Sequence, residues 1–350
     1  MKLASGHEAA ILEGEEREEM NKHWEGYGKG LVRLTPGRWL LPAPFLNFAD
    51  KYYSFKFKPS DVVVMTYSKS GTTWMQEIVW TMRNNPELNH PMTNTHIFAR
   101  SPFLEFDMIT ASSNTPPPLD HPLVQAFFKM CPGKNPLDGA QLQMTEVLPE
   151  PRTIKSHLPF SLLTPGLLDT AKVVYVARNP KDVCVSYYHQ QRLVKVAEFV
   201  GDFPEYVDFW TQDLLLQAPY WPHLAEGWAR RHHPNVLFLF YEDMKEDILR
   251  ELGRLNTFLG TALTESQLQT VARHTSFSGM KSRGATNPTA ALQESGEFKK
   301  GEAAFIRKGT TGDWTNFFTP ELEEKFGEWM EKWRPTSEEI PFRYQIKIPE

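Results

Sequence analysis

The sequence carries a run of small hydroxyl residues around a lysine, a combination that suits the binding of a phosphate-like anion. The run reads Tyr67-Ser68-Lys69-Ser70-Gly71-Thr72-Thr73-Trp74 and follows an apolar segment. At a strand–loop–helix junction, several backbone N–H groups and the positive end of the helix point at one spot. Lys69 would add a full positive charge there. Taken alone, a solvated lysine ahead of an ordinary helix cap remains an alternative.

The order of residues in this loop differs from that of a Walker A loop, in which the lysine follows the last glycine. Here Lys69 precedes Gly71. A later apolar segment ends in Arg178, where a nucleoside triphosphate kinase would be expected to place an aspartate for Mg²⁺. A basic residue at that point favours an anion site without a metal, so no metal is expected and a kinase is the second interpretation.

Two further groups could bind phosphate. Arg178 is followed eight residues later by Ser186, and a guanidinium with a nearby hydroxyl can grip an anion through several donors. Arg307-Lys308-Gly309 offers side-chain and backbone donors together. In isolation, Arg178 could instead pair with Asp182 or Glu242, and the later group could be a solvated loop.

A candidate base occurs in Lys155-Ser156-His157, at the end of a second predicted strand. Ligands of open α/β sheets bind at the carboxyl ends of strands, and the pKa of histidine suits proton removal near neutral pH. Lys155 beside it would stabilise developing negative charge. A histidine that merely packs in a loop is the alternative.

Apolar runs alternate with helical patterns, which predicts an α/β domain with a central, mostly parallel sheet flanked by helices. Strands are expected at 61–67, 152–155, 172–177 and 236–240, and helices at 72–83, from 181 onward, at 242–259 and at 319–333. Pro180 suits a first helical turn, and Thr319 followed by Pro320 suits the start of the last helix.

The chain is expected to form one domain over residues 36–350, preceded by a polar arm over residues 1–35 that could be mobile. A long segment at about 107–150 contains Pro116-Pro117-Pro118, Pro122 and Pro136 and is predicted to be too proline-rich for regular structure. It is interpreted as a lid over an acceptor pocket, with a plain surface insertion as the alternative. Residues 281–308 are predicted to be irregular and carry six basic side chains.

Composition excludes several classes. A formal net charge of −5 argues against general binding to nucleic acid or an anionic membrane. The two cysteines, Cys131 and Cys184, lack the spacing of a zinc site or a disulfide scaffold. No signal peptide and no apolar stretch of about 20 residues is evident. A cytoplasmic location is therefore expected.

Together these motifs resemble the cytosolic sulfotransferase family, from about residue 59 to residue 333. The family's YPKSGTTW motif appears with Ser68 in place of proline, and its KxHLP motif appears as Lys155-Ser156-His157-Leu158-Pro159. The other motifs occur in family order as residues 175–182 continuing to Ser186-Tyr187-Tyr188-His189, then Tyr241-Glu242-Asp243-Met244-Lys245, Thr275-Ser276-Phe277 and Arg307-Lys308-Gly309.

The resemblance implies transfer of a sulfuryl group from 3′-phosphoadenosine 5′-phosphosulfate (PAPS) to a hydroxyl. It implies a P-loop-like strand–loop–helix for the phosphosulfate and in-line attack with His157 as base, assisted by Lys69 and Lys155. The residues that it assigns to the nucleotide are Lys69, Ser70, Gly71, Thr72, Thr73 and Trp74 in the loop, and Arg178, Ser186, Tyr241, Thr275, Ser276, Phe277, Met280, Arg307, Lys308 and Gly309 elsewhere. Trp74 and Phe277 would stack on adenine.

The resemblance places the acceptor beside Phe103-Leu104-Glu105-Phe106, which looks like the family's aromatic pocket segment. Phe103, Phe106, Tyr188, Lys155 and His157 are the expected acceptor residues. An aromatic pocket favours a phenol, sterol, retinoid or other apolar alcohol. The alternative, that both phenylalanines belong to the core, stays open.

Two departures from the family pattern matter. The span from Lys69 to Lys155 is long, as in insect members that include the retinol dehydratase type, so dehydration through a transient sulfate ester is a second possible outcome. The dimerisation motif KxxxTVxxxE is degenerate, with Thr315 for lysine and Pro320 for valine although Thr319 and Glu324 remain. A homodimer is therefore an open prediction.

A non-catalytic nucleotide-binding module is the alternative from another class of function. The presence of both Lys69 and His157 argues against it.

Overall fold

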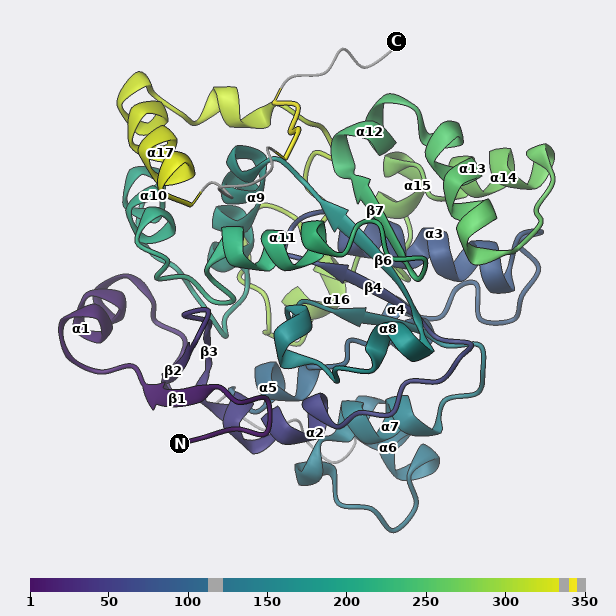
Figure 1. The fold of residues 1–350 in the computed structure, drawn as a ribbon, viewed down its shortest axis with the longest axis horizontal. Coiled ribbons are helices and arrows are strands. Elements are labelled where there is room, and N and C mark those ends of the chain that lie inside the picture. Colours follow the sequence, from purple (N-terminus) through teal and green to yellow (C-terminus); the bar gives the residue numbers. More distant parts are fainter. Residues whose placement is uncertain (113–121, 334–339, 345–350) are drawn as a thin grey trace.

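The centre of the molecule is a parallel sheet of four strands in the order β5-β4-β6-β7 (Figure 1). The computed structural model describes residues 1–112, 122–333 and 340–344. The strands are β4 (Val62–Thr66), β5 (Thr153–Ser156), β6 (Lys172–Ala177) and β7 (Val236–Phe240). All pairs are parallel, so the carboxyl ends of the strands meet at one edge. The predicted α/β class is confirmed.

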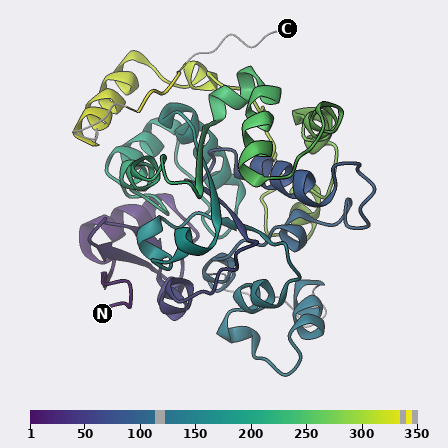
Figure 2. The same cartoon turned by 45° about the vertical axis from the view of Figure 1, so that its right-hand side comes forward.

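Both faces of this sheet are covered by helices because alternate strand residues enter two apolar layers. Val62 and Val64 of β4 belong to one layer, and Val63 and Met65 belong to the other. The first layer contains residues of α3 (Thr72–Asn84), α13 (Ile248–Leu259) and α14 (Glu265–His274). The second contains residues of α8 (Leu167–Thr170), α9 (Pro180–Leu193), α10 (Phe203–Thr211), α11 (Tyr220–Ala229) and α17 (Pro320–Trp333). The turned view in Figure 2 separates the two layers.

The helix boundaries follow local capping chemistry. Asn179 precedes Pro180, and its side chain accepts the N–H of Asp182 at the start of α9. The helix expected at 242–259 is instead two helices, α12 (Tyr241–Glu246) and α13. Asp247 separates them, and its side chain accepts the N–H of Arg250. A cap inside an otherwise helical pattern therefore explains the break.

The N-terminal segment differs from the polar arm that we expected. It forms β1 (Glu8–Ile11), α1 (Gly14–His23) and β2 (Leu31–Thr35), and β2 pairs with β1 and with β3 (Leu40–Pro42) in a second, antiparallel sheet. Trp24 is 4% exposed, and its ring lies 4.6 Å from that of Phe199. The apolar residues of the N-terminal segment are therefore packed on the main domain. The polar composition of this segment did not reveal that packing.

The segment at 107–150 is also more regular than we expected. It contains α5 (Phe106–Thr110), α6 (Pro122–Met130), the 3₁₀ helix η2 (Pro136–Asp138) and α7 (Ala140–Val147). Pro122 and Pro136 begin helical segments, where proline costs nothing because the first N–H has no helical partner. The buried carboxylate of Asp107 accepts the N–H groups of Gln141 and Leu142 at the start of α7. Pro116-Pro117-Pro118 lies outside the described residues.

Shorter elements complete the fold. They are η1 (Ala43–Asn47), α2 (Ala49–Tyr53), α4 (Ile97–Arg100), η3 (Phe160–Leu162), α15 (Phe277–Lys281), α16 (Thr289–Glu294) and η4 (Asp313–Asn316). The predicted irregular stretch at 281–308 thus includes one short helix, α16. Within the residues described, none of the helices combines the length and apolarity that crossing a membrane requires.

Candidate active site

The loop between β4 and α3 is shaped by two left-handed residues. Lys69 has φ +69° and Gly71 has φ +99°. A Cβ atom on Gly71 would lie 2.7 Å from the ring of Tyr241, so glycine is required both by the backbone and by the close approach of that ring. The loop therefore turns sharply into α3 and exposes its backbone at the carboxyl edge of the sheet.

A cavity of about 170 Å³ lies over this loop. Sixteen of the predicted site residues line it, from both early and late parts of the chain: Lys69, Gly71, Thr72, Thr73, Trp74, Lys155, His157, Arg178, Ser186, Tyr241, Thr275, Phe277, Met280, Arg307, Lys308 and Gly309. Six other residues that line the cavity had no predicted role: Ser68, Gln190, Lys245, Phe305, Ile306 and Thr310. Lys245 and Phe305 lie within or beside recognised motifs, and nothing in the pattern marked Gln190.

Five predicted residues are not among those that line the cavity: Ser70, Phe103, Phe106, Tyr188 and Ser276. Ser276 caps α15 by accepting the N–H of Gly279. Tyr188 packs 5.4 Å from Phe203, and its hydroxyl accepts a hydrogen bond from Arg192. Its ring belongs to the apolar layer around α9, which removes the geometric support for an acceptor contact.

Several buried polar atoms near the loop have no hydrogen-bond partner within the described part of the chain. They include the Ser70 hydroxyl, the Trp74 indole N–H and Nε of Arg178. A buried donor left unpaired costs about 1–3 kcal/mol. Phosphate and sulfate oxygens would accept from such donors, so the residues present fit an anionic nucleotide.

The orientation of His157 is set by β4. Its Nδ1 lies 2.8 Å from the carbonyl oxygen of Thr66 and 3.2 Å from the Thr66 hydroxyl. A carbonyl only accepts, so Nδ1 carries the proton, and Nε2 is left with its lone pair. Among the described residues Nε2 has no hydrogen-bond partner, while the ring lines the cavity. Burial, reinforced by the charge of Lys155, holds the pKa of His157 well below 6.5.

A buried carboxylate that we did not assign supports this histidine from behind. Glu105 is fully buried and accepts the backbone N–H of His157 and the hydroxyl of Ser156. Burial raises the pKa of Glu105 and lowers that of Lys155, and the two opposite charges counteract both effects. The only sequence signal for Glu105 was its place inside the Phe103–Phe106 motif.

Lys155 lies against the expected acceptor wall. Its Nζ is 3.9 Å from the ring centre of Phe103, and that ring is 5.3 Å from the ring of His157. Phe106 stands 5.8 Å from Phe103 in a second row. The structure therefore brings the ring of Phe103 to His157 and Lys155, and the ring of Phe106 lies next to that of Phe103.

The positive charges around the cavity repel one another. Lys69 has its pKa lowered to about 7, first by burial and then by Lys155, Arg178 and Arg307. Its Nζ also lies 4.5 Å from the centre of the Phe305 ring. A bound anion would offset this repulsion, so the cluster is suited to a highly charged ligand.

The two other basic groups are held in place by local partners. Arg178 donates to the carbonyl oxygens of Lys69 and Thr310 at 3.3 and 2.9 Å and lies 3.8 Å from Asp182, so the pairing considered as an alternative is present but long. Glu242 instead accepts from Asn179. Arg307 and Lys308 each lie 2.6 Å from Asp313.

Comparisons with known proteins agree with this geometry. The family model described as the sulfotransferase domain matches residues 59–337. The chain is 35% identical to Sulfotransferase 1A1 of Rattus norvegicus over 296 residues, which cover 84% of this chain and 90% of that protein. It is 34% identical to Sulfotransferase 1E1 of Homo sapiens over 308 residues, covering 88% and 94%.

Among solved structures, the chain is similar to retinol dehydratase in two complexes. The complex with androsterone and the inactive cofactor PAP superposes with a TM-score of 0.82 at 31% identity, covering 96% of this chain and 98% of that one. The complex with retinol and PAP gives a TM-score of 0.81 at 32% identity, covering 96% and 99%. The resemblance inferred from the motifs is confirmed.

Proposed function

Because the chain belongs to the sulfotransferase family, we propose that it sulfates the hydroxyl of a small apolar alcohol or phenol with His157 as the base. The chain is a PAPS-dependent sulfotransferase. The proposal concerns the acceptor and the role of each side chain. One observation supports this proposal most directly. Nδ1 of His157 donates a hydrogen bond to the carbonyl oxygen of Thr66, so Nε2 can accept a proton from a ligand in the cavity.

His157 would take the proton of the acceptor hydroxyl on Nε2. As the proton leaves, the acceptor oxygen forms a bond to sulfur, and the bond between sulfur and the bridging oxygen of the nucleotide breaks. PAPS supplies the activated sulfuryl group. Lys69 and Lys155 would stabilise the charge that grows on the bridging and equatorial oxygens, and positioning plus electrostatics would supply the catalysis, as in phosphoryl transfer.

The nucleotide would be held from three sides. Residues 70–73 would donate to the phosphosulfate, with the Ser70 hydroxyl as one unpaired donor. Trp74 and Phe277, which both line the cavity, would stack on adenine, and Tyr241, Thr275 and Met280 would border it. The 3′-phosphate would be bound by Arg178, Ser186, Arg307, Lys308 and Gly309. Ser276 would act through its cap on α15.

The acceptor would lie against Phe103, whose ring stands beside both His157 and Lys155. Phe106 would support that wall and begin α5, the first helix of the 107–150 segment. We assign the described part of this segment, residues 107–112 and 122–150, to the acceptor end of the cavity, where it would limit the entry of water. Retinol and androsterone, the ligands of the similar retinol dehydratase structures, are the acceptors to test first.

A second outcome of the same first step is dehydration. The TM-score of 0.82 to retinol dehydratase favours it, because a sulfate ester of an allylic alcohol such as retinol can eliminate sulfate together with a proton, which breaks the C–O bond and forms a new C=C bond. Exclusion of water by the described part of the 107–150 segment would then matter for the fate of the ester. The mass of the product separates a stable ester from a dehydrated hydrocarbon.

The test incubates the protein with PAPS and retinol, androsterone or 4-nitrophenol and identifies the products by mass. His157→Ala should lower kcat by about 10²–10⁴-fold while PAP still binds, as expected when a general base is lost. His232→Ala is the control, because His232 is an exposed histidine that does not line the cavity. Undiminished turnover by His157→Ala would exclude His157 as the base. PAP binding without any product would leave a nucleotide-binding role.

A further inference from the structure

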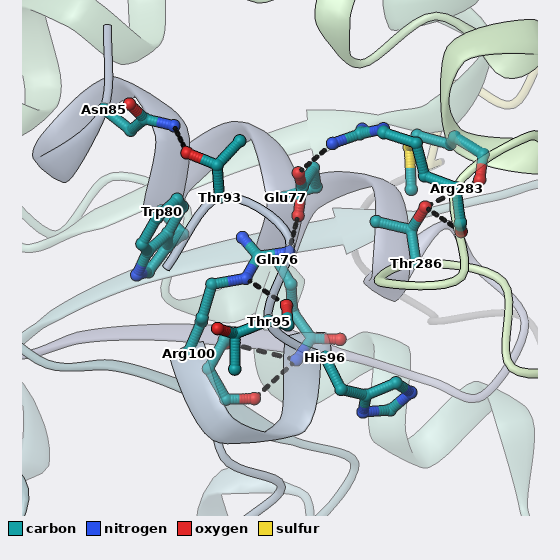
Figure 3. A network of polar contacts seen from close by, with 12 residues as sticks. Gln76, Glu77, Trp80, Asn85, Thr93, Thr95, His96, Arg100, Arg283 and Thr286 are labelled. Carbon is teal, nitrogen blue, oxygen red and sulfur yellow. Dashed lines mark hydrogen bonds and ion pairs between the residues drawn. The ribbon is translucent and has the colours of Figure 1, made fainter. Parts of the chain in front are cut away.

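A buried cluster of charges lies on α3, outside the cavity, and the reaction as proposed does not use it. Its centre is Glu77, which is fully buried and is not among the residues that line the cavity. Figure 3 shows Arg100 and Arg283 reaching Glu77 from different segments of the chain. One carboxylate therefore joins α3 to two elements that are far apart in sequence.

The contacts that run from Glu77 through Arg283 to α15 form what we call the first arm. The residues of α15 that line the cavity, Phe277 and Met280, form what we call the nucleotide wall. Nη1 of Arg283 lies 3.0 Å from Oε1 of Glu77, and Nε donates to the carbonyl oxygen of Gly279 at 2.9 Å. Gly279 belongs to α15, which also carries Phe277 and Met280 of the cavity. Arg283 thus links the end of this short helix to Glu77.

A second contact closes the first arm. Nη2 of Arg283 donates to the carbonyl oxygen of His274 at 3.0 Å, and Nε2 of His274 lies 3.1 Å from Oε1 of Glu77. Thr286 donates to the carbonyl oxygen of Met280 at 2.6 Å. The backbone on both sides of α15 is therefore held by this cluster, and with it the position of Phe277.

The contacts that run from Glu77 through Arg100 form the second arm. They lead to Phe103, the residue of the proposed acceptor wall. Nη2 of Arg100 lies 2.8 Å from Oε2 of Glu77, with both side chains 0% exposed, and Nε donates to the carbonyl oxygen of Thr95 at 2.8 Å. The guanidinium also stacks 4.3 Å from the ring centre of Trp80. These contacts fix Arg100, the last residue of α4.

The acceptor wall comes directly after Arg100 in the sequence. Gln76, the neighbour of Glu77 on α3, donates to the carbonyl oxygen of Ser101 at 2.9 Å. The next residues form a parallel bridge between Phe103 and Lys155, in which the N–H of Leu104 donates to the carbonyl oxygen of Lys155 at 2.9 Å. The position of the Phe103 ring is thus set from α3.

The charge state of Glu77 suits this role. Burial by itself would raise the pKa of this carboxyl, but the contact with His274 and the charges of Arg100 and Arg283 lower it to about 2. Glu77 is therefore ionised at neutral pH. A buried carboxylate between two guanidinium groups resists displacement, because moving it would take the counter-charge away from both partners.

We propose that Glu77 is a positioning residue that holds the nucleotide wall through Arg283 and the acceptor wall through Arg100. The acceptor half of this inference rests on the proposed acceptor site, and the nucleotide half rests on the proposed contact of Phe277 with adenine. If Glu77 were merely a structural ion pair, loosening either arm would lower stability without separating the two substrates. The positioning role instead predicts a different binding defect for each arm.

Arg283→Gln cuts the first arm while Glu77 keeps Arg100. It should raise the Kd of PAP, measured by calorimetry, about tenfold, which corresponds to ~1.4 kcal/mol, with the KM for retinol within about twofold. Arg100→Lys keeps the buried charge and loses the fixed geometry of the second arm. It should raise the KM for retinol about fivefold and leave the Kd of PAP within about twofold.

The matched control is Arg254→Gln. Arg254 also pairs with a buried glutamate, Glu251 on α13, and neither residue lines the cavity. This variant should leave both the Kd of PAP and the KM for retinol unchanged. Hydrogen exchange at the N–H of Leu104 gives a readout of the second arm that needs no acceptor, and exchange should be faster in Arg100→Lys than in the parent or in the control.

Separate defects in the two arms would support the proposal. Equal changes of both constants in both variants, or no change in either folded variant, would overturn it. Failure of the parent protein to turn over retinol, androsterone or 4-nitrophenol would count against the proposed acceptor or leave only the nucleotide-binding role, and by itself would not contradict the positioning role of Glu77. The PAP titration of Arg283→Gln and the exchange at Leu104 would still decide whether Glu77 positions the two walls.

Discussion

Nδ1 of His157 lies 2.8 Å from the carbonyl oxygen of Thr66, the last residue of β4. The same strand then leads into the loop that carries Lys69 and Gly71. One strand end therefore orients the proposed base, His157, and starts the loop that we propose binds the anion. On the other side, the carbonyl oxygen of His157 accepts from Nε2 of His223, whose Nδ1 lies 2.7 Å from the hydroxyl of Tyr175.

The acid limb of the pH profile should reflect this environment. Burial and the nearby charge of Lys155 hold the pKa of His157 well below 6.5, so the neutral, active form persists as pH falls through 6.5. We expect kcat to stay constant between pH 8 and 6.5 and to fall only at lower pH. Stopped assays with saturating PAPS and retinol would measure this. An acid limb with its midpoint at or above pH 6.5, attributable to His157, would contradict the assignment.

Binding of PAP should be coupled to proton uptake near pH 8. The pKa of Lys69 is lowered to about 7 in the free protein, first by burial and then by neighbouring cations, so Lys69 is largely neutral at pH 8. An anion beside it favours the charged form, and binding should raise its pKa and take up a proton. Affinity should therefore weaken as pH rises from 7 to 9.

Calorimetry in buffers with different ionisation enthalpies measures this uptake. Lys69→Met is the matched variant, since it removes the titrating group and should bind PAP more weakly with less proton uptake. An equal uptake in the variant would assign the proton to another group, and no uptake in the parent protein would refute the prediction.

Gly309→Ala should weaken nucleotide binding. Gly309 has φ +66°, and a Cβ atom there would lie 2.1 Å from the ring of Phe277, which must then move. We expect the Kd of PAP to rise about tenfold or more. Gly296→Ala provides the control, because Gly296 also has a positive φ, +83°, but a Cβ would meet nothing within 4 Å. Both variants carry the left-handed strain of about 1–2 kcal/mol, so a similar Kd in both would show that the contact with Phe277 is unimportant.

Arg152→Met should strongly destabilise the fold. Arg152 and Asp61 form a buried ion pair with side chains 1% and 0% exposed, joined at 2.7 Å from Nε to Oδ1. Removing one partner of such a pair leaves the other charge buried, at a cost of about 3–5 kcal/mol. Thermal unfolding followed by circular dichroism would measure the loss. Lys22→Met removes an exposed pair with Glu19 and should leave the midpoint unchanged. If Arg152→Met lowered the midpoint of thermal unfolding no more than Lys22→Met does, this account would be contradicted.

The sequence alone determined the elements whose signals are local. β6 and β7 have the predicted bounds because short apolar runs rich in β-branched and aromatic residues suit strands buried on both faces. The loop at Lys69, the start of α9 at Pro180 and the start of α17 at Pro320 depend on turn and capping residues only a few positions apart. Most of the residues that line the cavity were predictable for the same reason, since each belongs to a short motif.

Tertiary structure decided what depends on contacts between distant segments. Glu105 supports His157 across 52 positions of sequence, and Glu77 meets Arg283 across 206, so no local pattern marks either carboxylate. The packing of Trp24 on Phe199 turns an apparently polar arm into part of the domain, and Asp107 fixes α7 in a segment that its prolines made look irregular. Burial and charge pairing depend on which groups come together in space, and the order of the strands in the sheet brings them together.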